Sequence, residues 1–191
     1  MWKDFKPTIL FLVKFFAIYG ILSFAYGKYI NHYDSLEDPK TDPITSFVAF
    51  NCTNSSTIFG YEPLIIRDDH LNTKSESEQT FDSIWLSGKY AISVEEGCNG
   101  INIMILFLAF IIAFGGKLLN TLVFIPFGIL FIHASNIGRL MLLALINVKF
   151  EGQAFHFFHK FGFTAIIYLS ILFLWYLWVK KYSGKTKVKK A

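Results

Sequence analysis

Long apolar runs with few charged side chains constrain this fold more than any other feature. Residues 8–30 form the first run, and Lys14 lies close enough to its start for its long side chain to reach a membrane interface. Only 17% of the chain is charged, whereas about a quarter is usual for soluble domains. A helix of roughly 20 apolar residues crosses a bilayer. The sequence therefore predicts a membrane-embedded chain whose first run is a retained span, because no small-residue cleavage site follows it.

The chain becomes strongly apolar again after Asn99, in the runs 101–114, 118–133, 134–148 and 161–179. The run 134–148 is shorter than the roughly 20 residues that a helical span needs. It also contains Asn136 and Arg139. We therefore expect four transmembrane helices, together with a half-inserted helix at 134–148 on the outer side of the membrane.

Between the first span and the later apolar runs, residues 31–97 are polar and strongly acidic. Residues 34–96 contain 12 acidic side chains and four basic ones. Within this loop, residues 45–50 and 59–66 are short apolar stretches that form strands or lie on the membrane. The predicted fold class is thus an all-α integral membrane protein with an extracytoplasmic loop of mixed structure.

The lysines after Val179 decide the orientation. Residues 180–191 contain six lysines and no acidic residue, and Lys-rich flanks of spans stay in the cytoplasm. Nucleic-acid binding favours basic residues interleaved with aromatic ones on a surface, whereas these lysines adjoin an apolar run. We expect a multi-pass protein of the cytoplasmic (inner) membrane, with the lipid bilayer and not nucleic acid as its environment. Four crossings place both termini inside and the acidic loop outside.

In this topology several reactive side chains gather at the outer face. Cys98 lies at the start of the second span, Arg139 lies in the outer-leaflet helix, and His156 and His159 precede the last span. A thiolate can attack a carbonyl, an imidazole can transfer protons, and a guanidinium can stabilise an oxyanion, so the set suffices for acyl transfer. Glu95 and Glu96 would disfavour a thiolate at Cys98, and Arg139 is the nearest cation that can compensate.

Simpler interpretations exist for each residue. A membrane cysteine is often a small buried hydrophobe, and Arg139 would also suit an anchor to lipid phosphate. Histidines beside a span are often interfacial. Cys52 and Cys98 could also form a disulfide in an oxidising exterior.

Three short motifs resemble those of the exosortase/archaeosortase family. Residues 96–101, Glu-Gly-Cys-Asn-Gly-Ile, resemble its Glu-Ala-Cys-Ser-Gly box. Residues 136–139, Asn-Ile-Gly-Arg, resemble its Asn-x-x-Arg box, and residues 159–162, His-Lys-Phe-Gly, resemble its histidine box. The short chain, with one span before the cysteine box, is most similar to the exosortase F type. Asn99 departs from the usual Ser.

The resemblance implies a membrane-embedded cysteine protease or transpeptidase that cleaves C-terminal sorting signals through a thioester. Its partners would be exported proteins that end in a short motif, a hydrophobic helix and a basic tail. No cofactor and no metal are implied. The roles carried over are Cys98 as nucleophile, Arg139 as partner of the oxyanion or thiolate, and His159 as acid/base. The supporting residues would be Glu96, Asn99, Gly100, Asn102, Asn136 and His156.

Four parts of the chain follow from these predictions. They are an N-terminal transmembrane helix (1–30), the extracytoplasmic acidic loop (31–97), a membrane-embedded catalytic core (98–179) and a cytoplasmic Lys-rich tail (180–191). If the three motifs form one site, the Cys98 sulfur, the Arg139 guanidinium and a His159 ring nitrogen should lie within roughly 4–6 Å of one another.

Two other functions remain open at this point. The chain could be a non-enzymatic membrane anchor or assembly subunit whose acidic loop binds a partner. It could also be a thiol–disulfide oxidoreductase, although that chemistry usually needs paired cysteines, and Cys52 and Cys98 are far apart in sequence.

Overall fold

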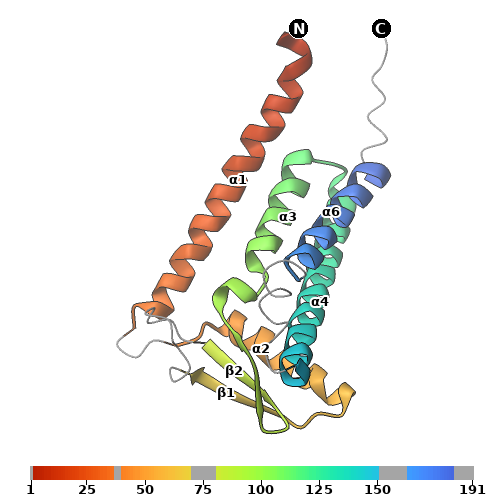
Figure 1. The fold of residues 1–191 in the computed structure, drawn as a ribbon. Coiled ribbons are helices and arrows are strands. Elements are labelled where there is room, and N and C mark those ends of the chain that lie inside the picture. Colours follow the sequence, from red (N-terminus) through yellow and green to blue (C-terminus); the bar gives the residue numbers. More distant parts are fainter. Residues whose placement is uncertain (1, 37–39, 70–80, 151–162, 183–191) are drawn as a thin grey trace.

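The computed structural model describes residues 2–36, 40–69, 81–150 and 163–182. Most of them are helical, and a small antiparallel sheet accompanies the helices (Figure 1). The elements are α1 (Trp2–Asp34), α2 (Pro43–Ser56), η1 (Thr57–Phe59), β1 (Pro63–Asp69), β2 (Phe81–Leu86), β3 (Lys89–Val94), η2 (Glu96–Cys98), α3 (Ile101–Phe114), α4 (Leu118–Phe150) and α6 (Phe163–Tyr182).

The elements separate into two ends. Figure 1 shows the start of α1, the turn between α3 and α4, and the end of α6 at one end of the molecule, with α2 and the sheet at the opposite end. The helices α1, α3, α4 and α6 extend between the two ends. The sidedness of the acidic loop and the termini relative to a membrane stays a prediction.

Among the described residues, two helices, Phe5–Asp34 and Leu118–Lys149, are long and apolar enough to cross a membrane by length and composition. The 14 residues of α3 rise about 21 Å at 1.5 Å per residue, less than the ~30 Å of a hydrocarbon core. The predicted span at residues 8–30 is supported by α1, which covers these residues and continues beyond them at both ends. The count of four crossings stays a prediction.

The prediction of a separate half-inserted helix at 134–148 is wrong. Residues 118–133 and 134–148 form one continuous helix, α4, which contains 33 residues. It rises about 50 Å at 1.5 Å per residue, well beyond a bilayer core. Residues 129–137 contain no Gly or Pro, so nothing in the local chain stops the helix between His133 and Ala134.

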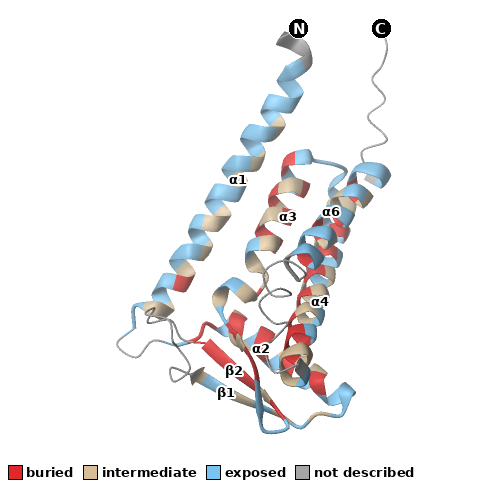
Figure 2. Ribbon diagram, in the orientation of Figure 1, coloured by how far each residue is buried: buried red, intermediate tan, exposed pale blue. Residues whose placement is uncertain are grey.

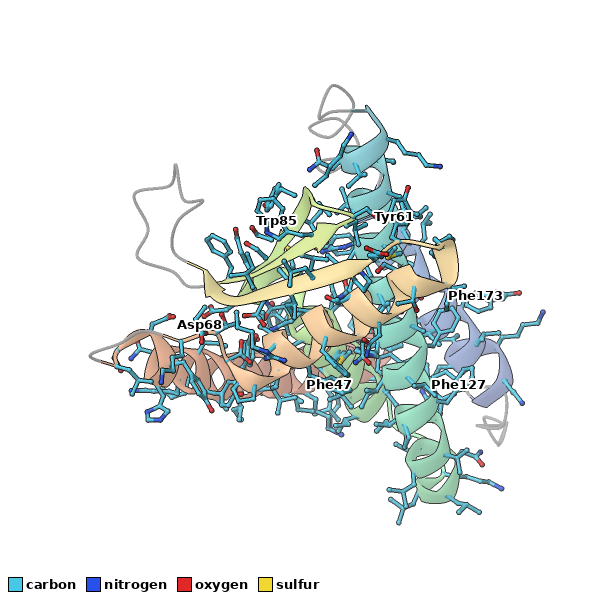
Figure 3. All side chains as sticks on the ribbon, turned by 90° about the horizontal axis from the view of Figure 1, so that it is seen from below. Phe47, Tyr61, Asp68, Trp85, Phe127 and Phe173 are labelled. Atoms are coloured by element: carbon cyan, nitrogen blue, oxygen red, sulfur yellow. The ribbon has the colours of Figure 1, made fainter. Side chains whose placement is uncertain are left out.

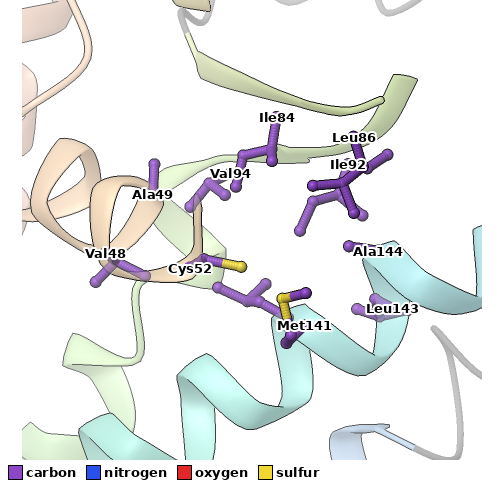
Figure 4. Close-up of a cluster of buried hydrophobic side chains, with 12 residues drawn as sticks. Val48, Ala49, Cys52, Ile84, Leu86, Ile92, Val94, Met141, Leu143 and Ala144 are labelled. Atoms are coloured by element: carbon purple, nitrogen blue, oxygen red, sulfur yellow. The ribbon is translucent and has the colours of Figure 1, made fainter. Parts of the chain in front are cut away.

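The C-terminal half of α4 packs into a hydrophobic cluster with α2 and the sheet (Figure 4). Leu140, Met141, Leu143 and Ala144 are all buried there. Their partners come from α2, β2 and β3: Val48, Ala49, Cys52, Ile84, Leu86, Ala91, Ile92 and Val94. The segment is therefore covered by protein and is not an isolated interfacial helix.

Residues 45–50 are helical, so the strand alternative for them is wrong. Asp42 caps α2, because its side chain accepts hydrogen bonds from the backbone N–H groups of Ile44 (2.9 Å) and Thr45 (3.2 Å). Pro43 occupies the first turn, where its fixed φ favours the helix and its missing N–H costs nothing. These two residues start a helix that the apolar pattern alone did not reveal.

A three-stranded antiparallel sheet in the order β1-β2-β3 follows α2, so the fold is not wholly α. Strands β2 and β3 are joined by Ser87 and Gly88, both with positive φ (50° and 79°). Two such residues form the tight hairpin turn that suits the twist of antiparallel strands. The hairpin directs the chain from β3 towards Cys98.

The end of the molecule away from the sheet has its own cluster, built from α3, α4 and α6. Phe107, Phe124 and Trp178 are buried in it. Gly128 allows the close approach, since a Cβ there would lie 2.2 Å from the Phe107 ring. Along α1, by contrast, most side chains are exposed (Figure 2), as expected of a helix that faces lipid on much of its surface.

Candidate functional site

Cys98 ends a short turn between the sheet and a long helix. The turn η2 (Glu96–Cys98) follows the extended Glu95, and the Cys98 N–H donates to the Glu95 carbonyl over 2.8 Å. Cys98 itself is half-buried, and Gly100, with φ of +84°, then redirects the chain into α3. This left-handed conformation favours glycine, which explains the glycine two residues after the cysteine. The sequence thus places a thiol at the junction of the sheet and the apolar helix α3.

Asn136 joins the cysteine box to the second motif. It is 1% exposed on α4, and its Nδ2 donates to the Cys98 carbonyl oxygen over 2.8 Å. Asn136 also packs against Gly100, where a Cβ would lie 3.3 Å from the Asn136 side chain. Two motifs that are 38 residues apart in sequence therefore meet in space.

Arg139 lies one helical turn after Asn136, on the same side of α4. It is half-buried, and its Nε is buried without a hydrogen-bond partner among the described residues. A buried guanidinium N–H that lacks a partner is costly. Such an N–H is available to an incoming carbonyl or carboxylate.

Glu96 carries an unusual carboxyl group beside the thiol turn. Burial, together with the charge of Asp34 and a hydrogen bond to it, raises the pKa of Glu96 from its ordinary 4.5 to about 7. Asp42 and Glu95 raise it further. Much of the negative charge expected next to Cys98 is therefore absent below neutral pH, which reduces the opposition to a thiolate.

The two cysteines have different environments. Both are free in this structure, which gives no support to the disulfide alternative between Cys52 and Cys98. Cys52 is 1% exposed in the cluster between α2 and the sheet, and burial raises the pKa of its thiol to about 12. Cys52 therefore has the properties of an inert core residue.

The predicted histidines, His156 and His159, lie outside the described residues, so their distances from Cys98 stay predictions. Among the supporting residues, Asn99 is buried and Asn102 is exposed on α3. Within the described ranges, no three His, Cys, Asp or Glu side chains are grouped so that they could hold a metal ion.

His133 is a described residue near the site to which the sequence assigned no role. It lies one turn before Asn136 on α4, and its ring stacks on Phe47 of α2 with 5.6 Å between centroids. The Asn51 Nδ2 lies 3.5 Å from the His133 Nε2. Seen from the sheet end (Figure 3), Phe47 is on the side of α2 that faces away from the sheet. A histidine inside an otherwise apolar run was the available signal.

Fold and site together define a membrane protein with a half-buried thiol beside an asparagine–arginine helix turn. The family model of the transmembrane exosortases (Exosortase_EpsH) matches residues 10–176. The chain belongs to this exosortase family, whose members are in general membrane-embedded transpeptidases or proteases. No curated protein and no solved structure matches the chain.

Proposed function

We propose that this exosortase cleaves C-terminal sorting signals of exported proteins at the outer face of the cytoplasmic membrane. The substrate would end in a short motif, a hydrophobic helix and a basic tail. The observation that carries the proposal is the hydrogen bond from Asn136 to the Cys98 carbonyl. It unites the cysteine and arginine motifs at the boundary between the apolar helix cluster and the sheet.

In the proposed reaction the Cys98 thiolate attacks the scissile carbonyl carbon. A carbon–sulfur bond forms and the peptide C–N bond breaks, while the leaving amine takes a proton from the imidazolium of His159. Water or an amine then attacks the thioester carbonyl carbon and gives a proton to the imidazole. The carbon–sulfur bond breaks, which releases the Cys98 thiolate. Arg139 would stabilise the oxyanion through its Nε–H, which is buried and has no hydrogen-bond partner among the described residues.

The basic C-terminal end of α6 supports the proposed direction in which the substrate crosses the membrane. A substrate with a basic cytoplasmic end would cross the membrane in the same sense as α6, whose last turn contains Lys180 and Lys181. Its scissile bond, on the other side of its own hydrophobic helix, would then lie at the level of the thiol turn. Exosortase F is the family type that we propose, on the basis of the short chain.

The decisive experiment replaces Cys98 with Ala and follows the processing of co-expressed proteins that carry motif–hydrophobic–basic tails. We expect processing to be abolished, because the acyl group would have no acceptor sulfur. Cys52→Ala is the matched control, since it removes the other thiol and should keep processing. Normal processing by the Cys98→Ala variant would contradict the nucleophile assignment.

The same assay separates the alternatives. An anchor or assembly subunit would remain functional after Arg139→Ala and His159→Ala, whereas the proposed enzyme would lose processing in both. A thiol–disulfide oxidoreductase would need Cys52, and the burial of that thiol does not favour this function.

A further inference from the structure

Asn99, the residue that departs from the usual family motif, is the centre of a buried hydrogen-bond network. It is 1% exposed. Its Nδ2 donates to the Tyr26 hydroxyl over 2.6 Å and to the Thr45 Oγ1 over 2.9 Å. Its Oδ1 accepts from the Ile101 backbone N–H over 3.0 Å. An amide side chain supplies two donors and an acceptor, so Asn99 makes three hydrogen bonds where a serine hydroxyl has a single donor.

The two hydroxyl partners come from elements that are distant in sequence. Tyr26 lies on α1, 73 residues before Asn99, and Thr45 lies on α2, 54 residues before it. Thr45 is fully buried, and its backbone N–H donates to the capping Asp42. Thr45 is therefore held in place independently of Asn99.

The network ties the thiol turn to helices other than α4. Asn136 holds the Cys98 carbonyl from α4, and Asn99, the next residue in the chain, is held by α1 and α2. Because consecutive residues are attached to different helices, the turn has little freedom to rotate. A nucleophile gains rate when its approach to the carbonyl is fixed in advance.

The described polar contacts of α1 with other elements gather near its C-terminal end, where Tyr29 also donates to Asp42 over 3.4 Å and Asp34 bonds Glu96. The most apolar stretch of α1 has no buried residue, and it meets α3 through aromatic rings such as Phe11 and Phe110, with 5.7 Å between centroids. A helix with only a membrane-anchoring role needs no hydroxyl inserted at a buried amide. The Tyr26 hydroxyl is thus a specific link between this span and the thiol turn.

We propose that Tyr26 and Thr45 are positioning residues for Cys98, acting through Asn99, so that the N-terminal span is part of the active centre. This inference rests on the proposed function of Cys98. In this proposal α1 both anchors the chain in the membrane and helps to hold the nucleophile in place.

The test compares Tyr26→Phe and Thr45→Val by two measurements: processing of a co-expressed tailed substrate, and alkylation of Cys98 by N-ethylmaleimide, followed by peptide mass spectrometry. We expect processing to fall about fivefold in each variant, the factor that corresponds to one ordinary hydrogen bond. Alkylation of the half-buried Cys98 should become faster, because the loosened turn exposes the thiol. Alkylation of the buried Cys52 should stay slow. General unfolding would expose both thiols and lower the yield of membrane-inserted chain, whereas a loosened turn exposes Cys98 alone.

Matched controls remove equivalent groups elsewhere. Tyr19→Phe removes a hydroxyl from the same helix, and Thr53→Val removes a hydroxyl that bonds only within α2, to the Ala49 carbonyl. Both should behave as the unchanged protein. Thr45→Ser keeps the hydroxyl and should restore processing relative to Thr45→Val.

Unchanged processing and alkylation in both Tyr26→Phe and Thr45→Val would overturn the positioning role, while loss of processing in Cys98→Ala would leave the proposed function intact. Conversely, processing that survives Cys98→Ala would contradict the proposed function and, with it, the catalytic role of the positioning. Faster alkylation in the Tyr26→Phe variant would still support the restraint of the turn by α1.

Discussion

The two halves of α4 are similar in apolar character but differ in what surrounds them: the N-terminal half packs on one side against α3 and α6 and leaves other side chains exposed, whereas the C-terminal half packs beneath α2 and the sheet. Leu118 and Leu130 in the N-terminal half are 75% and 68% exposed, whereas Leu140 in the C-terminal half is 1% exposed beneath α2 and the sheet. An apolar run is compatible with a lipid-facing surface and with a protein core. Hydropathy alone does not separate the two, and the proposed site lies where one environment changes to the other, at Asn136.

The largest expected effect tests this difference between the halves directly. Leu140→Ala should lower the free energy of unfolding by about 2–5 kcal/mol, because it leaves a cavity in a packed cluster. Leu130→Ala should cost much less, since its side chain is exposed in the folded chain. Thermal unfolding of both variants in the same detergent checks the contrast. Equal losses of stability would mean that the two halves do not differ as described.

A smaller effect separates structural from functional hydrogen bonds within the C-terminal half. Asn136 and Asn147 both donate from α4 to a backbone carbonyl, the first to Cys98 over 2.8 Å and the second to Ala91 over 2.7 Å. Replacing either with Ala should cost about 1–3 kcal/mol of stability, because a buried carbonyl loses its donor.

Only the Asn136→Ala variant should also lose processing of a tailed substrate, by roughly tenfold or more, since its partner carries the thiol. Asn147→Ala serves as the control of equal chemistry. Loss of processing in proportion to stability in both variants would assign Asn136 a structural role only.

The sequence was sufficient for what depends on local chemistry. The apolar run 8–30 predicted α1, and the cysteine and arginine motifs, read in order, predicted a family that the family model confirms. The continuous α4 and the helix at Pro43–Ser56 were missed. The first error came from treating membrane thickness as a limit on helix length, and the second from ignoring the cap formed by Asp42 and Pro43.

The partners of Asn99 were beyond sequence reasoning for a different reason. Tyr26 and Thr45 are far from Asn99 along the chain, and each has an unremarkable context: a tyrosine near the end of a span and a threonine after a proline. Hydrogen bonds between distant segments depend on how the helices pack. The motif showed that Asn99 was unusual but could not show what it binds.

The smallest expected effect concerns the pH dependence of the thiol turn. Because the folded protein raises the pKa of Glu96 from 4.5 to about 7, the folded state holds a proton that the unfolded chain has already released over this range. The free energy of unfolding should therefore fall as pH rises from about 4.5 to about 7, and this contribution should then level off. Glu96→Gln removes that slope, so the variant should match the unchanged protein near pH 4 and be more stable than it at pH 8.

The neighbouring, exposed Glu95 supplies the control. Glu95→Gln removes the same charge one residue away. The pH slope of the free energy of unfolding should remain, because the pKa of Glu96 is raised mainly by its burial and its contact with Asp34. Denaturation curves at pH 4, 6 and 8 measure the stabilities, and alkylation of Cys98 over the same range measures the thiolate. Glu96→Gln should increase alkylation most above pH 7, where a carboxylate at position 96 would otherwise oppose the thiolate charge. An identical pH slope in the Glu96→Gln variant and the unchanged protein would show that the half-buried Glu96–Asp34 carboxyl pair does not form at the thiol turn.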